Sequence, residues 1–144
     1  MNAAQISHVE ASYRLVAPIA EPAAAIFYRR LFDLDPSLRP MFPQDLSSQE
    51  RKLMQAIGFV VAHLRVPEHL LPAVSALGAR HAGYGVQRQH YDTVGQALLL
   101  TLAEGLGDAF TPAVQDAWEA AYELLAKVMQ AAGQGSKPAE RQAA

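Results

Sequence analysis

His81 is the residue whose setting best suits metal chemistry, because it continues an apolar helical stripe. Leu70, Val74 and Leu77 precede it at spacings of four, three and four residues. An imidazole directed at an apolar core must stay neutral and satisfy both ring nitrogens. A metal on one nitrogen and a hydrogen bond on the other would do both. A core histidine bonded to a carbonyl would do so as well, so the stripe alone leaves both interpretations open.

Three other segments each supply a residue suited to a buried site. Tyr28 lies on the apolar side of a predicted helix, and Phe42 lies in a proline-rich corner. Gln49 is four residues before Leu53 and therefore shares its helical face. Tyrosine and glutamine can both donate hydrogen bonds to a ligand. The alternatives are a tyrosine bonded to a backbone carbonyl, a glutamine that faces water and an ordinary core phenylalanine.

The composition limits the classes of function. A length of 144 residues suits one compact domain, and a net charge of −2 with 18% charged residues gives no basic face for nucleic acid. The N-terminus lacks a basic start followed by an apolar core, and no apolar run is long enough to span a bilayer. We therefore expect a soluble cytoplasmic protein without a nucleic-acid or membrane partner. The absence of cysteine excludes disulfides, thiolate metal sites and cysteine nucleophiles.

The elements that must position these residues are all predicted to be helices, with prolines and glycines at the joints and no alternating strand pattern. The expected helices cover about 4–16, 22–32, a short turn within 36–43, 47–64, a short helix ending near Gly83, 90–106, and 112–129. Ser47 and Glu50 form a capping-box pattern. Pro67 and Pro72 punctuate the entry to the His81 helix. The polar segment 133–144 is predicted to be a disordered tail. We find no internal repeat, phosphate-binding loop, HExxH pair or GxSxG elbow.

Six segments in the right order give the chain a family resemblance over about residues 4–131. They are IFYRRLF, PSLRPMF, SSQERKLMQ, LGARHAGYGV, HYDTVGQALL and DAWEAAYELLAKVM. The chain resembles the bacterial single-domain globins, including Hell's Gate-type globins, and the haem domain of flavohaemoglobins. The resemblance implies a globin domain over residues 1–132, folded as a three-over-three helical sandwich around one haem b.

The resemblance also implies roles for individual residues. His81 matches the proximal ligand of the haem iron, and Phe42 matches the phenylalanine that packs on the haem. Tyr28 and Gln49 match a distal pair that donates hydrogen bonds to bound oxygen, and Leu53 matches the wall of that ligand site. Further positions that correspond to cofactor contacts are Lys52, Leu77, Arg80, Val86, Tyr91, Val94 and Leu98. Lys52 and Arg80 would lie near the propionates, although a solvated helix face would suit them equally.

The function implied is reversible binding of oxygen and of other diatomic ligands such as NO and CO. The alternative is a nitric oxide dioxygenase that takes electrons from a separate reductase, and a haem-free sensor module is less favoured. Two departures from the flavohaemoglobin pattern bear on this choice. The segment PQDLSS before Gln49 is shorter, and Ala132 or Gly133 stands where a glutamate would partner Tyr91. We therefore expect a weaker electron push on the iron.

Overall fold

The computed structural model describes residues 1–135, and this part of the chain contains helices and no strand. The α-helices are α1 (Ala3–Val16), α2 (Ala20–Leu34), α3 (Ser47–Ala62), α4 (Pro67–Gly83), α5 (Arg88–Leu106) and α6 (Pro112–Gly135). Three 3-10 helices join them: η1 (Ala17–Ile19), η2 (Pro36–Met41) and η3 (Gly107–Ala109). The prediction of an all-α fold is confirmed. Within residues 1–135, no helix has the length and apolar character needed to cross a membrane.

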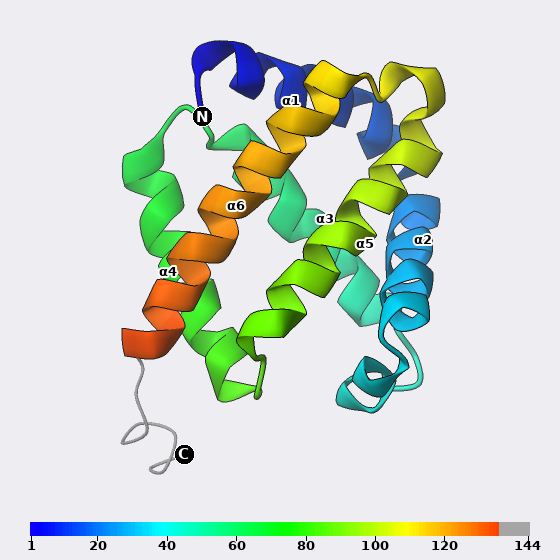
Figure 1. Ribbon diagram of the computed structural model, residues 1–144, viewed down its shortest axis with the longest axis vertical. Coiled ribbons are helices and arrows are strands. Elements are labelled where there is room, and N and C mark those ends of the chain that lie inside the picture. Colours follow the sequence, from blue (N-terminus) through cyan, green and yellow to red (C-terminus); the bar gives the residue numbers. More distant parts are fainter. Residues whose placement is uncertain (136–144) are drawn as a thin grey trace.

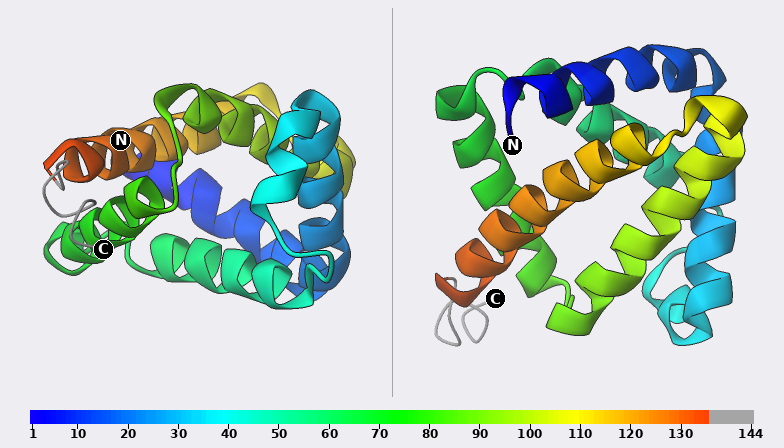
Figure 2. Two further views of the ribbon diagram at one scale, coloured as in Figure 1. Left: turned by 90° about the horizontal axis from the view of Figure 1, so that it is seen from below. Right: turned by 45° about the horizontal axis from the view of Figure 1, so that its top comes forward.

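The helices surround an interior that α3 and α5 face from opposite sides. Seen from below, α5 and α6 lie along one side of the molecule, α3 and α4 lie along the other, and α2 closes one end (Figure 2). The α6 helix packs against α4 and α1, whereas α5 packs against α2, and α2 packs against α3 (Figure 1). The last turn of α4, which carries His81, therefore approaches the interior from the end opposite α2.

Two apolar clusters fill the fold. The larger one has buried members on all six α-helices, and within it the Trp118 indole N–H on α6 donates a 2.8 Å hydrogen bond to the Ser12 hydroxyl on α1. The smaller cluster lies where α2, η2, α3 and α5 meet. Its buried members are Phe27, Tyr28, Leu31, Leu38 and Ala97. The predicted site residues on the α2 side belong to this smaller cluster.

Gly78 sets the close crossing of α4 and α6. A Cβ atom at this position would collide with the backbone of Met129, so only glycine permits the observed approach. His81 lies three residues further along α4. The crossing therefore fixes the position of α4 against α6, and with it the position of this histidine.

The observed helix ends correct several predictions. The capping box at Ser47 is wrong, because Ser47 is the first residue of α3 and its N–H donates to the Asp45 carboxylate at 3.0 Å. Pro72 lies inside α4, which has 17 residues and is not short. The α2 helix begins at Ala20, before Pro22. The α6 helix continues to Gly135, so 133–135 are helical, and the remainder of the predicted tail lies outside the described residues.

Candidate functional site

His81 lies in the last turn of α4 and is oriented by the backbone of its own helix. Its Nδ1 atom lies 2.8 Å from the Leu77 carbonyl oxygen. A carbonyl can only accept, so Nδ1 carries the proton, and Nε2 keeps a free lone pair in the neutral ring. This is how a metal-ligating histidine is usually held. His63 makes the same bond to the Phe59 carbonyl, but its ring is stacked on Phe59, with centroids 4.1 Å apart.

Among the described residues, no metal site made from side chains alone surrounds His81. Residues 1–135 contain no cluster of three or more His, Cys, Asp or Glu side chains that could hold a metal ion. A single imidazole can hold a metal firmly only where a cofactor supplies most of the other ligands, as a tetrapyrrole does. The donor set around His81 therefore fits an iron porphyrin better than a free ion.

Tyr28 projects from α2 into the smaller cluster and is only 5% exposed. Its hydroxyl donates a long hydrogen bond of 3.4 Å to the backbone carbonyl of Gln49, on the first turn of α3. Burial raises the pKa of Tyr28 to about 12, and the Gln49 side chain lowers it by less than burial raises it. Tyr28 therefore remains a neutral donor at physiological pH, and the structure brings it together with Gln49.

Phe42 closes this side of the site in a corner that Arg39 holds in shape. The Phe42 ring lies edge-on to Tyr28, with centroids 5.6 Å apart, and contacts Phe32 in the same way at 5.5 Å. Arg39 donates to the carbonyls of Phe42 and Pro43 at 3.3 and 2.9 Å, and its guanidinium lies 5.2 Å from the centre of the Phe32 ring. The 3-10 helix η2 and the Arg39 side chain thus fix the corner together, since the Phe42 N–H also donates to the Arg39 carbonyl at 3.1 Å.

The apolar residues that the resemblance assigns to the cofactor are partly buried. Phe42, Leu53, Leu77, Val86, Val94 and Leu98 are all half-buried, as is His81. Their helix neighbours Val74, Ala97 and Leu102 are buried. Four of the six, Phe42, Leu53, Val94 and Leu98, pack against the Tyr28 cluster. Leu77 and Val86 lie outside that cluster and form hydrogen bonds with His81. The Leu77 carbonyl faces the His81 ring, and the Val86 N–H donates to the His81 carbonyl. The half-buried apolar side chains near Tyr28 and those near His81 thus offer two surfaces that fit a flat apolar cofactor between α3, α4 and α5.

The remaining predicted residues lie at the edges of this region. Lys52 and Arg80 are exposed, which suits both a contact with the haem propionates and a solvated helix face. Tyr91 is half-buried, and desolvation raises its pKa. The Tyr122 hydroxyl donates a 2.6 Å hydrogen bond to the Tyr91 backbone carbonyl. The α6 helix thus supports the start of α5, although by a different contact from the carboxylate that the flavohaemoglobin pattern would place there.

The comparisons with known proteins decide the family. The globin family model matches residues 25–129. The chain belongs to the globin family. It is 34% identical over 128 residues to a flavohemoprotein of Bordetella parapertussis. The matched region covers 84% of this chain and 32% of that protein. It is 38% identical over 105 residues to a flavohemoprotein of Vibrio cholerae, covering 71% of this chain and 27% of that one. This globin spans about a third of the length of such curated relatives.

The predicted globin fold is confirmed by this match and by the helical architecture. Sequence reasoning missed the supporting residues of the site. Each supporting contact uses a backbone carbonyl: Arg39 donates to that of Phe42, Tyr122 to that of Tyr91, and His81 bonds to that of Leu77. Every residue has a backbone carbonyl, so the amino-acid type does not reveal such a partner. Of the three contacts, the bond to the Leu77 carbonyl could most easily have been predicted from the sequence, because a histidine ring on a helix can reach the carbonyl four residues earlier.

Proposed function

We propose that this globin binds haem b through His81 and reversibly binds oxygen, NO and CO at a site formed by Tyr28 and Gln49. The observation that carries the proposal is the His81 ring, whose Nδ1 is committed to the Leu77 carbonyl and whose Nε2 is left as a ligand. The half-buried apolar residues around it provide a surface of matching chemistry. The flavohemoprotein relatives carry haem in their name and support the same cofactor.

Haem, when bound, supplies an iron centre that takes up diatomic gases. The protein's own residues then set which gas is held and for how long. Phe42 and Leu53 keep water from the pocket, and in a dry pocket a hydrogen bond to a partly negative ligand is strong. Tyr28 is suited to donate that bond, because its present bond to the Gln49 carbonyl is long and its pKa keeps it protonated. Carbon monoxide gains less than oxygen from such a donor.

Stopped-flow measurement of oxygen release tests the role of Tyr28. Tyr28→Phe removes one charge-assisted donor, which typically costs ~1.5–3 kcal/mol and corresponds to release that is faster by about ten- to a hundredfold. Carbon monoxide release should change far less. Tyr84→Phe is the matched control, since Tyr84 is 69% exposed and should leave both rates unchanged. An oxygen release rate that Tyr28→Phe does not alter would remove Tyr28 from the mechanism.

A nitric oxide dioxygenase that uses a separate reductase is the second candidate. It is favoured by the relatives, whose name joins a flavin to a haem protein and whose length extends well beyond the matched part. Sustained consumption of nitric oxide with added cell reductases, at a rate matching NADH oxidation, would support the enzyme. A single turnover followed by a stalled ferric protein would support reversible binding alone.

Two further expectations stay predictions. They are the contacts of Lys52 and Arg80 with the haem propionates, and a cytoplasmic location.

A further inference from the structure

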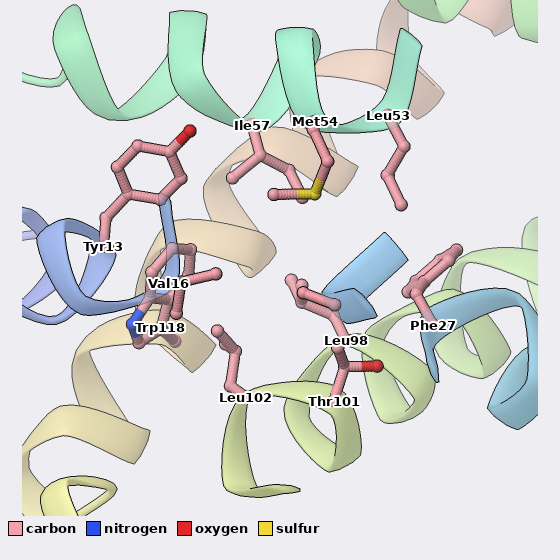
Figure 3. A pocket seen from close by; sticks show the side chains of 11 residues that line it. Tyr13, Val16, Phe27, Leu53, Met54, Ile57, Leu98, Thr101, Leu102 and Trp118 are labelled. Atoms are coloured by element: carbon pink, nitrogen blue, oxygen red, sulfur yellow. The ribbon is translucent and has the colours of Figure 1, made fainter. Parts of the chain in front are cut away.

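A small apolar cavity of about 20 Å³ lies directly behind the proposed ligand site. Leu53, Leu98 and Phe27 line the end nearest that site, and Tyr13, Val16 and Ile57 line the other end (Figure 3). The one hydroxyl on its α5 wall, that of Thr101, donates a 2.7 Å hydrogen bond to the Ala97 carbonyl. The Trp118 indole N–H is likewise bonded, to Ser12, so apart from the Tyr13 hydroxyl the lining offers little to a water molecule and suits a small apolar one.

Tyr13 lies between this cavity and a groove at the surface. It lines the inner cavity, and it also lines an open groove of about 240 Å³ at the surface between α1 and α3. Glu10 and Arg14 border the groove on α1, and Gly58 borders it on α3. Figure 3 shows the Tyr13 ring at the α1 end, with its hydroxyl directed toward α3. Among the described residues, only Tyr13 lines both the groove and the inner cavity.

The Tyr13 ring is held by packing and not by polar bonds. Its hydroxyl makes no hydrogen bond within residues 1–135, in contrast to the hydroxyls of Tyr28 and Tyr122. The hydroxyl instead rests on the backbone of Gly58, where a Cβ atom would lie only 2.9 Å away. Glycine at position 58 therefore provides the room that the hydroxyl occupies. A half-buried ring without a polar bond can swing outward on the timescale of side-chain motion.

We propose that Tyr13 is a gate for diatomic gases, which pass from the α1–α3 groove through the apolar cavity to the ligand site beside Leu53. The route depends on the proposed function for its destination, whereas the cavity and its gate are properties of the polypeptide. Gas transfer would then be controlled from α1, away from the Tyr28 and Gln49 donors. Replacing Tyr13 should change how fast a gas arrives without changing how firmly Tyr28 holds it.

Xenon is a suitable probe of the cavity, because it is apolar and does not bind iron. We expect xenon gas to shift the methyl NMR signals of Ile57 and Met54, both in the haem-free protein and in the diamagnetic ferrous CO form, and xenon exchange to be several-fold faster in Tyr13→Ala. Tyr13→Leu keeps more of the packing and should show the same direction of change if Tyr13→Ala folds poorly. Leu15→Ala, on the same helix but 56% exposed, is the matched control and should exchange xenon at the wild-type rate.

Recombination of carbon monoxide after laser photolysis tests the connection to the ligand site. Tyr13→Ala or Tyr13→Leu should speed bimolecular rebinding several-fold, and Leu15→Ala should not. Methyl signals unmoved by xenon would overturn the cavity, and equal xenon exchange or CO rebinding in the Tyr13 and Leu15 variants would overturn the gate. A protein that takes up xenon through Tyr13 but holds no haem would instead refute the proposed function, so the two failures are distinguishable.

Discussion

Tyr28 combines a buried phenol with a weakly engaged hydroxyl, and both features have measurable consequences. The ring packs against Phe27, Phe32 and Phe42, which remove it from water. Its hydroxyl makes a long hydrogen bond of 3.4 Å, which it would exchange for a bond to the ligand in the proposed function. The same burial that positions the donor also keeps its proton in place.

The raised pKa of Tyr28 predicts how stability depends on alkaline pH. The folded protein keeps this proton to about pH 12, whereas the unfolded chain releases it near the ordinary value of 10.0. The unfolded state therefore binds fewer protons between these values, and the free energy of unfolding must fall as pH rises from 10 to 12. Tyr28 accounts for about 2–3 kcal/mol of that loss. Burial raises the pKa values of Tyr91 and Tyr122 too, which adds to the same trend.

Urea unfolding at a series of alkaline pH values would measure this effect. Tyr28→Phe should lose less stability than the wild type between pH 10 and 12, while Tyr84→Phe, altered at an exposed ring, should follow the wild type. Equal slopes for Tyr28→Phe and the wild type would show that the ring is not buried in this way.

At the same scale, helical spacing on apolar faces selected His81, Tyr28 and Gln49 as candidates, and the family resemblance supplied their roles, which stay predictions. The residues that hold these candidates in place were not predicted. Arg39 was not identifiable, since a surface arginine in a proline-rich corner is usually solvated. Its role depends on carbonyls that turn toward it only in the folded corner.

The α4 helix carries His81, and its position against α6 depends on Gly78. Gly78→Ala would push the new methyl group into the Met129 backbone, and overpacking of this kind costs about 1–3 kcal/mol of stability. We also expect weaker haem retention, because α4 must move and His81 moves with it. Gly83→Ala is the matched control on the same helix, since a Cβ there meets no atom within 4 Å. A Gly78→Ala variant as stable as Gly83→Ala in urea would contradict the tight crossing.

Helix ends were the least predictable elements, for identifiable reasons. Pro72 suggests a break, because an interior proline removes one backbone hydrogen bond and its ring crowds the carbonyl four residues earlier, yet α4 continues through it. Ser47 and Glu50 match a capping box by spacing, yet Asp45 lies two residues earlier and accepts both the N–H and the hydroxyl of Ser47. Local patterns compete with one another, and the folded corner before α3 selects between them.

At the scale of the whole molecule, helical periodicity was enough to predict an all-α fold but not to choose a globin. The choice came from six ordered segments and is confirmed by the family match over residues 25–129. Periodicity could not show the cavity behind Leu53, because its lining comes from five helices whose relative positions no local pattern determines.

The central claim is that His81 binds the iron of a haem, and a hemin titration followed by visible absorption tests it most directly. The wild type should take up an equimolar amount of haem with a sharp Soret band. His81→Gly should lose that spectrum and regain it with added imidazole, while His63→Gly, which removes the other histidine bonded to a carbonyl four residues earlier, should match the wild type. An unchanged spectrum in His81→Gly, or a wild type with no Soret band after hemin addition, would contradict the account.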